Sequence, residues 1–296
     1  MPERKFFNLR SGYRIAALDW GGSNPLAILC HANGFCAATW SLVAELLREE
    51  FRVVALDTRG HGASSTPLDE NQYDWRFLVE DLLEVTNQLL ASSAAPHVEL
   101  LAGNSLGAVI GATAAAWEPE KFRAVVMLDP PVLPAGKGSL SNQIPKGTPN
   151  IAEQTRRRRR TFKSRDDVAK AYRRKKTFAD WREQTFEHYL QDGFSPQADG
   201  GLALRCPPEV EAAIFERTGS IDLFAEAKHV QAAVTLVHAK RGMFPYTLYQ
   251  RLIEQFSQGS LSSIDGGHLL PMELPEETAQ LLLNSVAAMR AHSTTG

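Results

Sequence analysis

The most informative segment of this chain is Val98-Glu-Leu-Leu-Ala-Gly-Asn-Ser-Leu-Gly107, and the helix-like run 108–117 follows it directly. Its first residues are mostly apolar and predict a buried strand, so a sharp strand-to-helix turn must come next. Such a turn forces strained backbone angles and a close approach of strand and helix. Gly103 and Gly107 flank Ser105 with the small residues that this geometry needs. Ser105 would then stand exposed at the carboxyl edge of a sheet, placed to attack a carbonyl carbon.

A histidine near the far end of the chain lies in a loop that can reach this edge. His268 follows the predicted strand 260–264, and the loop reads Asp265-Gly-Gly-His-Leu-Leu-Pro-Met-Glu273. The two glycines let the loop fold back over the sheet edge, and two prolines restrain the chain before the predicted helix 276–290. A serine nucleophile followed later by the histidine is the order expected of such an enzyme. His268 is therefore the candidate general base.

Two further segments complete a family pattern. Residues 26–35 read Leu-Ala-Ile-Leu-Cys-His-Ala-Asn-Gly-Phe, and residues 53–64 read Val-Val-Ala-Leu-Asp-Thr-Arg-Gly-His-Gly-Ala-Ser. The first looks like the strand and oxyanion loop of the α/β-hydrolase family, and the second like the strand and turn that precede the next helix. Together with the Ser105 turn and the His268 loop, they make nearly the whole chain resemble that family.

The resemblance implies an α/β fold in which an eight-stranded, mostly parallel sheet is flanked by helices and carries an inserted helical cap. The core would comprise residues 1–131 and 231–296, and the cap residues 132–230. Apolar periodicity favours the same plan. The predicted strands lie at residues 5–8 and 13–19 and around residues 27, 53, 98, 125, 234 and 261. The predicted core helices lie at residues 38–49, 75–91, 108–117, 246–256 and 276–290, and helical segments of the cap near residues 150–159, 165–175, 177–192 and 208–217.

The resemblance also implies an oxyanion hole made of two backbone N–H groups. The residue after the nucleophile, Leu106, supplies one of them. By its spacing along the loop, Asn33 stands in the family's second donor position, and Phe35 is the alternative. Ala32 occupies a place where the family commonly has glycine, so the sequence leaves the choice between Asn33 and Phe35 open.

The position of the acidic residue expected in the triad differs from the commonest pattern of the family. Its usual place follows the strand after the cap, read here as residues 233–238, but residues 239–245 contain no Asp or Glu. Asp129 ends the predicted strand 122–128 and would lie at the carboxyl edge of the sheet, where some family members keep their acid. We expect Asp129 to orient His268 and to stabilise its protonated ring. Weaker alternatives are Asp265, Glu273 and Asp222.

The predicted cap is unusually basic. Residues 156–182 hold thirteen Lys and Arg against three Asp, a formal charge of +10. One interpretation is that this charge attracts an anionic substrate such as a carboxylate or an acyl-CoA. The simpler and favoured one is that these are solvated helix faces balanced by acidic residues of the core. Nucleic-acid binding is not expected, because no recognition motif accompanies the run and the chain carries a net charge of −2.

Other polar residues are interpreted as structural. His31 and His61 would hydrogen-bond loop backbone, and Cys30, Cys36 and Cys206 are expected to be reduced, since they have no metal-ligand or disulfide spacing. The sequence predicts no metal site and no cofactor. It contains no apolar run near the roughly eighteen residues of a membrane span and no secretory signal, which predicts a cytoplasmic protein.

These patterns predict a cofactor-independent serine hydrolase of a carboxylic ester or thioester, with Ser105, His268 and Asp129 as the triad. The expected partner is a small-molecule ester or acyl substrate, with an anionic one as an option. The motif Gly-Asn-Ser-Leu-Gly also looks like that of family members that cleave carbon–carbon bonds in diketo acids. A catalytically silent ligand-binding member is a third hypothesis. Epoxide hydrolase and dehalogenase chemistry are disfavoured, because those relatives carry Asp where this chain has Ser105.

Overall fold

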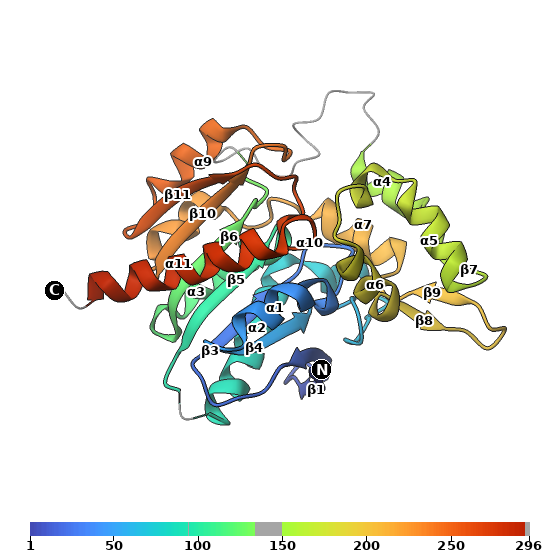
Figure 1. Cartoon of the computed structure of the whole chain (residues 1–296), viewed down its shortest axis with the longest axis horizontal. Coiled ribbons are helices and arrows are strands. Elements are labelled where there is room, and N and C mark those ends of the chain that lie inside the picture. The colour runs from blue at the N-terminus through green and yellow to red at the C-terminus, as the bar shows by residue number, and fades with distance from the viewer. Residues whose placement is uncertain (94, 134–149, 294–296) are drawn as a thin grey trace.

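A computed structural model describes residues 1–93, 95–133 and 150–293, which are built around an eight-stranded sheet (Figure 1). The strand order across the sheet is β1-β2-β4-β3-β5-β6-β10-β11. The strands are β1 (Glu3–Asn8), β2 (Arg14–Asp19), β3 (Leu26–Cys30), β4 (Arg52–Asp57), β5 (Val98–Asn104), β6 (Phe122–Leu128), β10 (Ala233–Ala239) and β11 (Gly259–Ile264).

The sheet is antiparallel at its β1 edge and parallel elsewhere. Strand β2 pairs antiparallel with both β1 and β4, whereas every pair from β4 to β11 is parallel. The middle strands are almost entirely buried, as parallel strands covered by helices on both faces must be. The predicted fold, an eight-stranded and mostly parallel α/β sheet, is confirmed.

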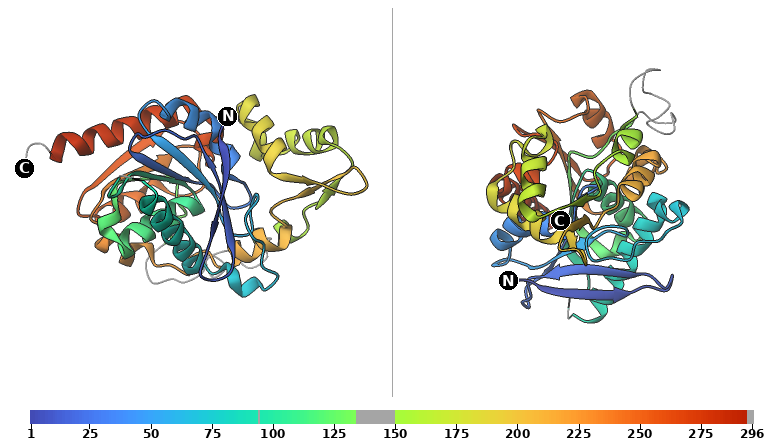
Figure 2. Two further views of the ribbon diagram at one scale, coloured as in Figure 1. Left: turned by 90° about the horizontal axis from the view of Figure 1, so that it is seen from below. Right: turned by 90° about the vertical axis from the view of Figure 1, so that its right-hand side faces the viewer.

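Helices cover both faces of this sheet (Figure 2). On one face lie α1 (Ser41–Leu47) and α11 (Pro275–Ser293), which pack on each other, and on the other lie α2 (Trp75–Ala91), α3 (Leu106–Trp117) and α9 (Tyr246–Ile253). Neighbouring residues of β6 face opposite sides of the sheet: Val126 packs on the side of α1 and α11, and Val125 packs on the side of α2, α3 and α9. This alternation is the two-residue period of a strand buried on both faces.

Residues 150–230 are here called the cap segment. Residues 150–204 of it lie at the end of the molecule away from β10 and β11 (Figures 1 and 2), whereas residues 223–229 return to the core and contact α3. The opening of the predicted cap, residues 134–149, lies outside the described residues. The longer helices of the cap segment are α4 (Ile151–Arg156), α5 (Arg165–Arg173), α6 (Glu183–Asp192) and α7 (Pro208–Glu216). The shorter helices of the chain are α8 (Leu223–Glu226), α10 (Leu270–Glu273), η1 (Ala37–Trp40), η2 (Glu70–Tyr73), η3 (Pro119–Lys121), η5 (Lys176–Phe178) and η6 (Ala227–His229).

The cap segment also holds a small antiparallel sheet that the sequence did not predict. Its strands are β7 (Thr161–Phe162), β8 (Phe194–Pro196) and β9 (Leu202–Leu204), in the order β7-β9-β8. Strands β8 and β9 form a hairpin, whose loop includes Gly200 at φ +82°. Strands of two or three residues are too short to display a period, so only their tertiary pairing reveals them.

The cap segment is joined to the core through aromatic rings. Phe35, in the loop after β3, lies 5.2 Å from the ring of Trp181, 5.5 Å from Tyr189 and 6.2 Å from Phe178. These three cap rings are buried. Contacts at such distances contribute beyond the burial of area alone, so they fix the cap segment over this loop.

Candidate active site

The strand-to-helix turn at Ser105 has the strained geometry that its sequence predicts. Ser105 has φ 55° and ψ −115°, a conformation that side-chain-bearing residues rarely adopt, and it connects β5 directly to α3. A Cβ atom on Gly103 would clash with the backbone of Gly107, and one on Gly107 would clash with the carbonyl of Cys30 at the end of β3. Both glycines are required by close packing of strand and helix.

The loop after β11 brings His268 to this turn. Its ring Nε2 lies 2.9 Å from Ser105 Oγ. Glu273 shapes the loop, because its carboxylate accepts hydrogen bonds from the N–H groups of Gly267 at 2.7 Å and Leu269 at 3.2 Å. A carboxylate bound to the backbone on both sides of His268 fixes the direction in which the imidazole leaves the loop.

Asp129 reaches the opposite side of the imidazole. The carboxyl group is fully buried at the end of β6, and its Oδ2 lies 2.6 Å from His268 Nδ1. Its other oxygen, Oδ1, accepts hydrogen bonds from the N–H of Ala239 at 3.0 Å and from the hydroxyl of Tyr249 at 2.8 Å. The structure thus brings Ser105, His268 and Asp129 into one hydrogen-bonded chain.

The absence of an acid in residues 239–245 has a structural counterpart. A Cβ atom on Gly242 would lie 2.5 Å from Asp129 Oδ2, so the loop after β10 leaves room for the carboxylate that comes from β6. The last residue of β10, Ala239, supplies the N–H that binds Asp129. The alternative acids are engaged elsewhere: Asp265 is exposed and pairs with Arg241, and Asp222 caps α8.

Two residues that sequence reasoning missed support this chain. Asn104, directly before the nucleophile, donates its side-chain amide to the carbonyls of Leu128 at 3.0 Å and His268 at 2.9 Å. Tyr249 holds Asp129 as described above. Asn104 stood in the quoted motif, but a sequence does not show which carbonyls an amide will meet. Tyr249 carried no local signal beyond its place on an amphipathic helix.

The expected oxyanion donors, Leu106 and Asn33, line a cavity together with Ser105. Leu106 is the first residue of α3, so its N–H is one of the groups that a helix leaves without an intrahelical partner. Within the described part of the chain, the backbone N–H groups of Leu106 and Asn33 donate to no other protein group. The N–H of Phe35, by contrast, donates to the carbonyl of Ala32 at 3.3 Å.

Two buried imidazoles hold the loop that carries Asn33. The ring of His61 accepts the N–H of Gly34 at its Nε2, 2.9 Å away, and that of His31 accepts the N–H of Thr58 at 3.0 Å. Burial lowers the pKa of His61 to about 3 and that of His31 to about 4, so both rings are neutral and keep these acceptor nitrogens. Both contacts match the structural roles expected of these histidines.

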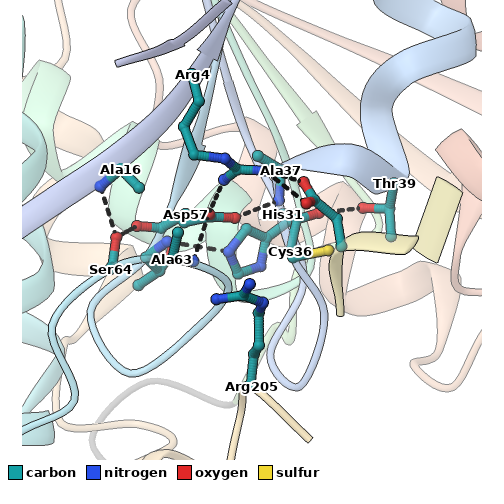
Figure 3. A network of polar contacts seen from close by, with 12 residues as sticks. Arg4, Ala16, His31, Cys36, Ala37, Thr39, Asp57, Ala63, Ser64 and Arg205 are labelled. Carbon is teal, nitrogen blue, oxygen red and sulfur yellow. Dashed lines mark hydrogen bonds and ion pairs between the residues drawn. The ribbon is translucent and has the colours of Figure 1, made fainter. Parts of the chain in front are cut away.

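A buried carboxylate, that of Asp57, also holds the end of the loop after β3 (Figure 3). Asp57, the last residue of β4, accepts hydrogen bonds from the N–H groups of Ala37 at 2.7 Å and Ala63 at 2.9 Å. Arg4 of β1 lies 3.3 Å from Asp57 and also pairs with Asp192 at the end of α6. Burial raises the pKa of Asp57 to about 6, although these partners favour its charged form. The network links β1, the loop after β3 and the cap segment.

A cavity of about 410 Å³ opens at Ser105 between the core and the cap segment. Apolar side chains form much of its wall, and its charged lining residues besides the imidazole are Arg158, Lys175 and Glu211. A smaller cavity of about 60 Å³ shares Ser105 and His268 and is lined mainly by apolar residues. The site can therefore accept a small organic molecule whose reacting carbon lies at the serine.

The described residues contain no group of three or more His, Cys, Asp or Glu side chains arranged to hold a metal ion. The thiols of Cys30, Cys36 and Cys206 are free and buried, and they do not line the two cavities at Ser105. Over the same described residues, no helix is both long and apolar enough to cross a bilayer.

Comparisons with known proteins agree with this fold. The chain is 30% identical over 142 residues to bifunctional epoxide hydrolase 2 of Sus scrofa, and 36% identical over 115 residues to esterase Rv0045c of Mycobacterium tuberculosis. These alignments cover 48% and 39% of this chain but only 24% and 36% of the relatives. The solved structure of E-2-(acetamidomethylene)succinate hydrolase superposes with a TM-score of 0.78 at 20% identity, covering 97% of this chain and all of that one.

The family comparison extends over most of the sequence. A family model described as "Alpha/beta hydrolase family" matches residues 27–281, which include the Ser105 turn, Asp129 and the His268 loop. The eight-stranded sheet and the strained serine between β5 and α3 are the structural counterparts of that match. This chain belongs to the alpha/beta hydrolase family.

Proposed function

We propose that this protein is a serine hydrolase that cleaves a carboxylic ester or thioester through an acyl-enzyme intermediate. The observation that carries the proposal is the hydrogen-bonded chain from Ser105 Oγ through His268 to Asp129, with separations of 2.9 and 2.6 Å. Both distances lie within hydrogen-bonding reach, as proton transfer between a nucleophile and its base requires. The steps need only this chain's own residues and water.

In the first half-reaction, His268 Nε2 accepts the proton of Ser105 as Oγ attacks the substrate carbonyl carbon. The negative charge that develops on the carbonyl oxygen is stabilised by the N–H groups of Leu106 and Asn33. We favour Asn33 over Phe35 because the N–H of Phe35 already donates to Ala32. His268 then gives its proton to the departing alkoxide or thiolate, which leaves Ser105 acylated.

In the second half-reaction, His268 removes a proton from water, and the resulting hydroxide attacks the acyl carbon. The tetrahedral intermediate collapses, Ser105 recovers its proton from His268, and the carboxylic acid departs. Asp129 remains ionised throughout, holds the Nδ1–H of His268 and stabilises the imidazolium that forms in each half. Its Oδ1 accepts hydrogen bonds from the Ala239 N–H and the Tyr249 hydroxyl, which leaves Oδ2 directed at His268.

The relatives support hydrolysis but differ in chemistry. One aligned relative is an esterase, one is an epoxide hydrolase, and a structural neighbour hydrolyses a substituted succinate, by their names. This chain places a serine hydroxyl at position 105, which favours attack on an acyl carbon over the epoxide chemistry of relatives that carry Asp there. The division into a core and a cap and the cytoplasmic location stay predictions of the sequence.

The experiment is intact-protein mass spectrometry after exposure to a fluorophosphonate, comparing wild type with Ser105→Ala. One adduct on the wild type, absent from the variant, is expected because only an activated serine reacts at an appreciable rate. A panel of alkyl esters and thioesters then measures turnover. Folded wild type that takes up no adduct and hydrolyses no acyl substrate would overturn the proposal in favour of a ligand-binding protein.

A further inference from the structure

The basic residues of the cap segment are mostly neutralised by nearby carboxylates. Of the thirteen Lys and Arg in residues 156–182, seven lie within 4.0 Å of a carboxylate oxygen. Several partners belong to other parts of the fold: Arg156 pairs with Glu70 before α2, and Arg182 with Glu276 in α11. Most of the formal +10 charge therefore serves cap-to-core and intra-cap ion pairs. The paired residues are Arg156, Arg158, Arg159, Arg160, Arg165, Arg173 and Arg182.

One basic residue combines the lack of such a partner with a place at the nucleophile. Among the described ion pairs, six basic residues of this stretch have no carboxylate within 4.0 Å: Arg157, Lys163, Lys170, Arg174, Lys175 and Lys176. Only Lys175 also lines the cavity that contains Ser105 and His268. Its neighbour Lys176 does not line that cavity.

The ammonium of Lys175 is held by an aromatic ring. Its Nζ lies 4.4 Å from the ring centre of Tyr172, which is buried and whose hydroxyl accepts a hydrogen bond from Arg158 at 2.9 Å. Burial and the neighbouring charge of Arg158 lower the pKa of Lys175 from its ordinary value, and the carboxylate of Glu211 opposes them only in part. An anion bound beside Lys175 would stabilise its charged form, because the anion would offset the repulsion between the ammonium and the Arg158 guanidinium and the loss of hydration on burial.

The charged side chains that line the cavity carry a net positive charge, which favours the binding of an anion. Glu211 is buried and pairs with Arg158, so these two neutralise each other. Lys175 then leaves one net positive charge on a wall that also presents apolar side chains such as Phe35 and Phe178. One positive charge beside apolar surface suits a carboxylate on a hydrocarbon chain better than a doubly charged phosphate.

We propose that the cavity selects acyl substrates that carry a second, free carboxylate, bound by Lys175 with Arg158 as an additional donor. This inference rests on the proposed function, since it assigns the substrate class of the same site. The scissile carbonyl would lie at Ser105 while the free carboxylate accepts charge-assisted hydrogen bonds from the ammonium of Lys175. Residues of the cap segment would thereby determine substrate specificity, and residues of the core would carry out catalysis.

The test uses matched pairs of substrates. Monoethyl esters of linear dicarboxylic acids with four to eight carbons are compared with ethyl esters that have an isopropyl group in place of the free carboxylate. For wild type we expect kcat/KM to favour the acidic member of the best pair by at least about tenfold. Lys175→Met should lower that ratio about tenfold, Lys175→Arg should retain most of it, and the control Lys176→Met should leave the ratio unchanged.

The outcomes separate this inference from the proposed function. If neutral esters are hydrolysed and no acidic ester is preferred, the anion site is wrong while the serine hydrolase stands. If neither type is hydrolysed, the proposed function fails, and calorimetric titration of Ser105→Ala with the free dicarboxylates decides the site. If Ser105→Ala binds a dicarboxylate and the double variant with Lys175→Met does not, the anion site is supported. If Ser105→Ala binds none of the dicarboxylates, the anion site is overturned.

Discussion

The side-chain amide of Asn104 donates hydrogen bonds to the backbone carbonyls of His268, at 2.9 Å, and Leu128, at 3.0 Å. The Leu128 carbonyl also accepts the N–H of Ser105 at 3.0 Å. Because Asn104 precedes Ser105 and Leu128 precedes Asp129, one buried amide joins the three loops that carry the proposed triad. Asn104 is therefore a positioning residue for the nucleophile, the base and the acid.

Asn104→Asp should separate this role from simple packing. The aspartate has the same shape, but its oxygen would face two carbonyl oxygens that then lose their donor, at a cost of about 1–3 kcal/mol each. We expect kcat on the best ester to fall by about 10–100-fold with a smaller change in KM. The loss should lessen as pH falls, because a protonated carboxyl regains a donor for one carbonyl.

The control for this prediction is Asn284→Asp on the exposed surface of α11, which should behave as wild type. The ratio of variant to wild-type kcat across pH is the decisive readout, since a purely structural defect would shift thermal stability without this pH dependence. A ratio that stays flat, or turnover equal to wild type, would contradict the positioning role.

The sequence could predict that Ser105, Asp129 and His268 meet, because each residue directly follows a predicted strand or lies in the loop after one. The carboxyl ends of parallel strands meet at one edge, so Ser105 after β5, Asp129 after β6 and His268 after β11 had to converge once the strands were identified. Asp129 was the hardest of the three to identify, and the clue was that residues 239–245 contain no Asp or Glu. The central strands β3, β5 and β6 followed from apolar runs of the kind that buried parallel strands require.

Contacts across the fold could not be predicted in the same way. The roles of Asn104 and Tyr249 depend on which atoms their side chains reach, and those atoms lie 24 and 120 residues away along the chain. The pairing of the basic residues in the cap segment likewise depends on carboxylates from distant helices. The hairpin of β8 and β9 is too short for any periodicity to reveal it.

Asp129→Asn should fold almost normally and lose most turnover. Asparagine keeps the shape of the side chain but cannot stabilise the imidazolium, and its amide can present a donor to Nδ1 that favours the wrong tautomer of His268. We expect kcat to fall by about a thousandfold or more, measured on the best ester alongside the melting temperature. Wild-type activity in a folded variant would assign the acid to another residue.

Tyr249→Phe tests the support of that carboxylate. It removes the hydroxyl that donates to Asp129 Oδ1 at 2.8 Å but leaves the ring in place, and the Ala239 N–H continues to bind the same oxygen. A modest loss is therefore expected, about 1 kcal/mol of unfolding free energy and a few-fold in kcat. Urea unfolding and steady-state kinetics measure the two; a loss as large as that of Asp129→Asn would mean that Tyr249 has a more direct part.

Gly107→Ala and Gly111→Ala form a matched pair within α3. A methyl group at 107 would clash with the carbonyl of Cys30, whereas one at 111 would meet only the side chain of Leu101, at an ordinary 3.5 Å. Gly107→Ala should cost about 3 kcal/mol or more, or prevent folding, because backbone cannot move aside. Gly111→Ala should be neutral or stabilise by up to about 1 kcal/mol through helix propensity. Equal melting temperatures for the two variants would contradict the close strand-to-helix packing.

His61→Gln should change how stability depends on pH. Burial lowers the pKa of His61 to about 3, so between about pH 6.5 and pH 4 the unfolded chain binds a proton on this ring that the folded chain does not. The unfolding free energy should therefore fall as pH falls through this window, by roughly 3 kcal/mol at most. Asp57, whose pKa burial raises to about 6, acts in the opposite direction in both proteins. Chemical unfolding of wild type and variant at each pH isolates the contribution of His61. The unfolding free energy of the wild type should fall more steeply toward pH 4 than that of the variant. Parallel pH dependences would show that His61 does not stay neutral in the folded loop.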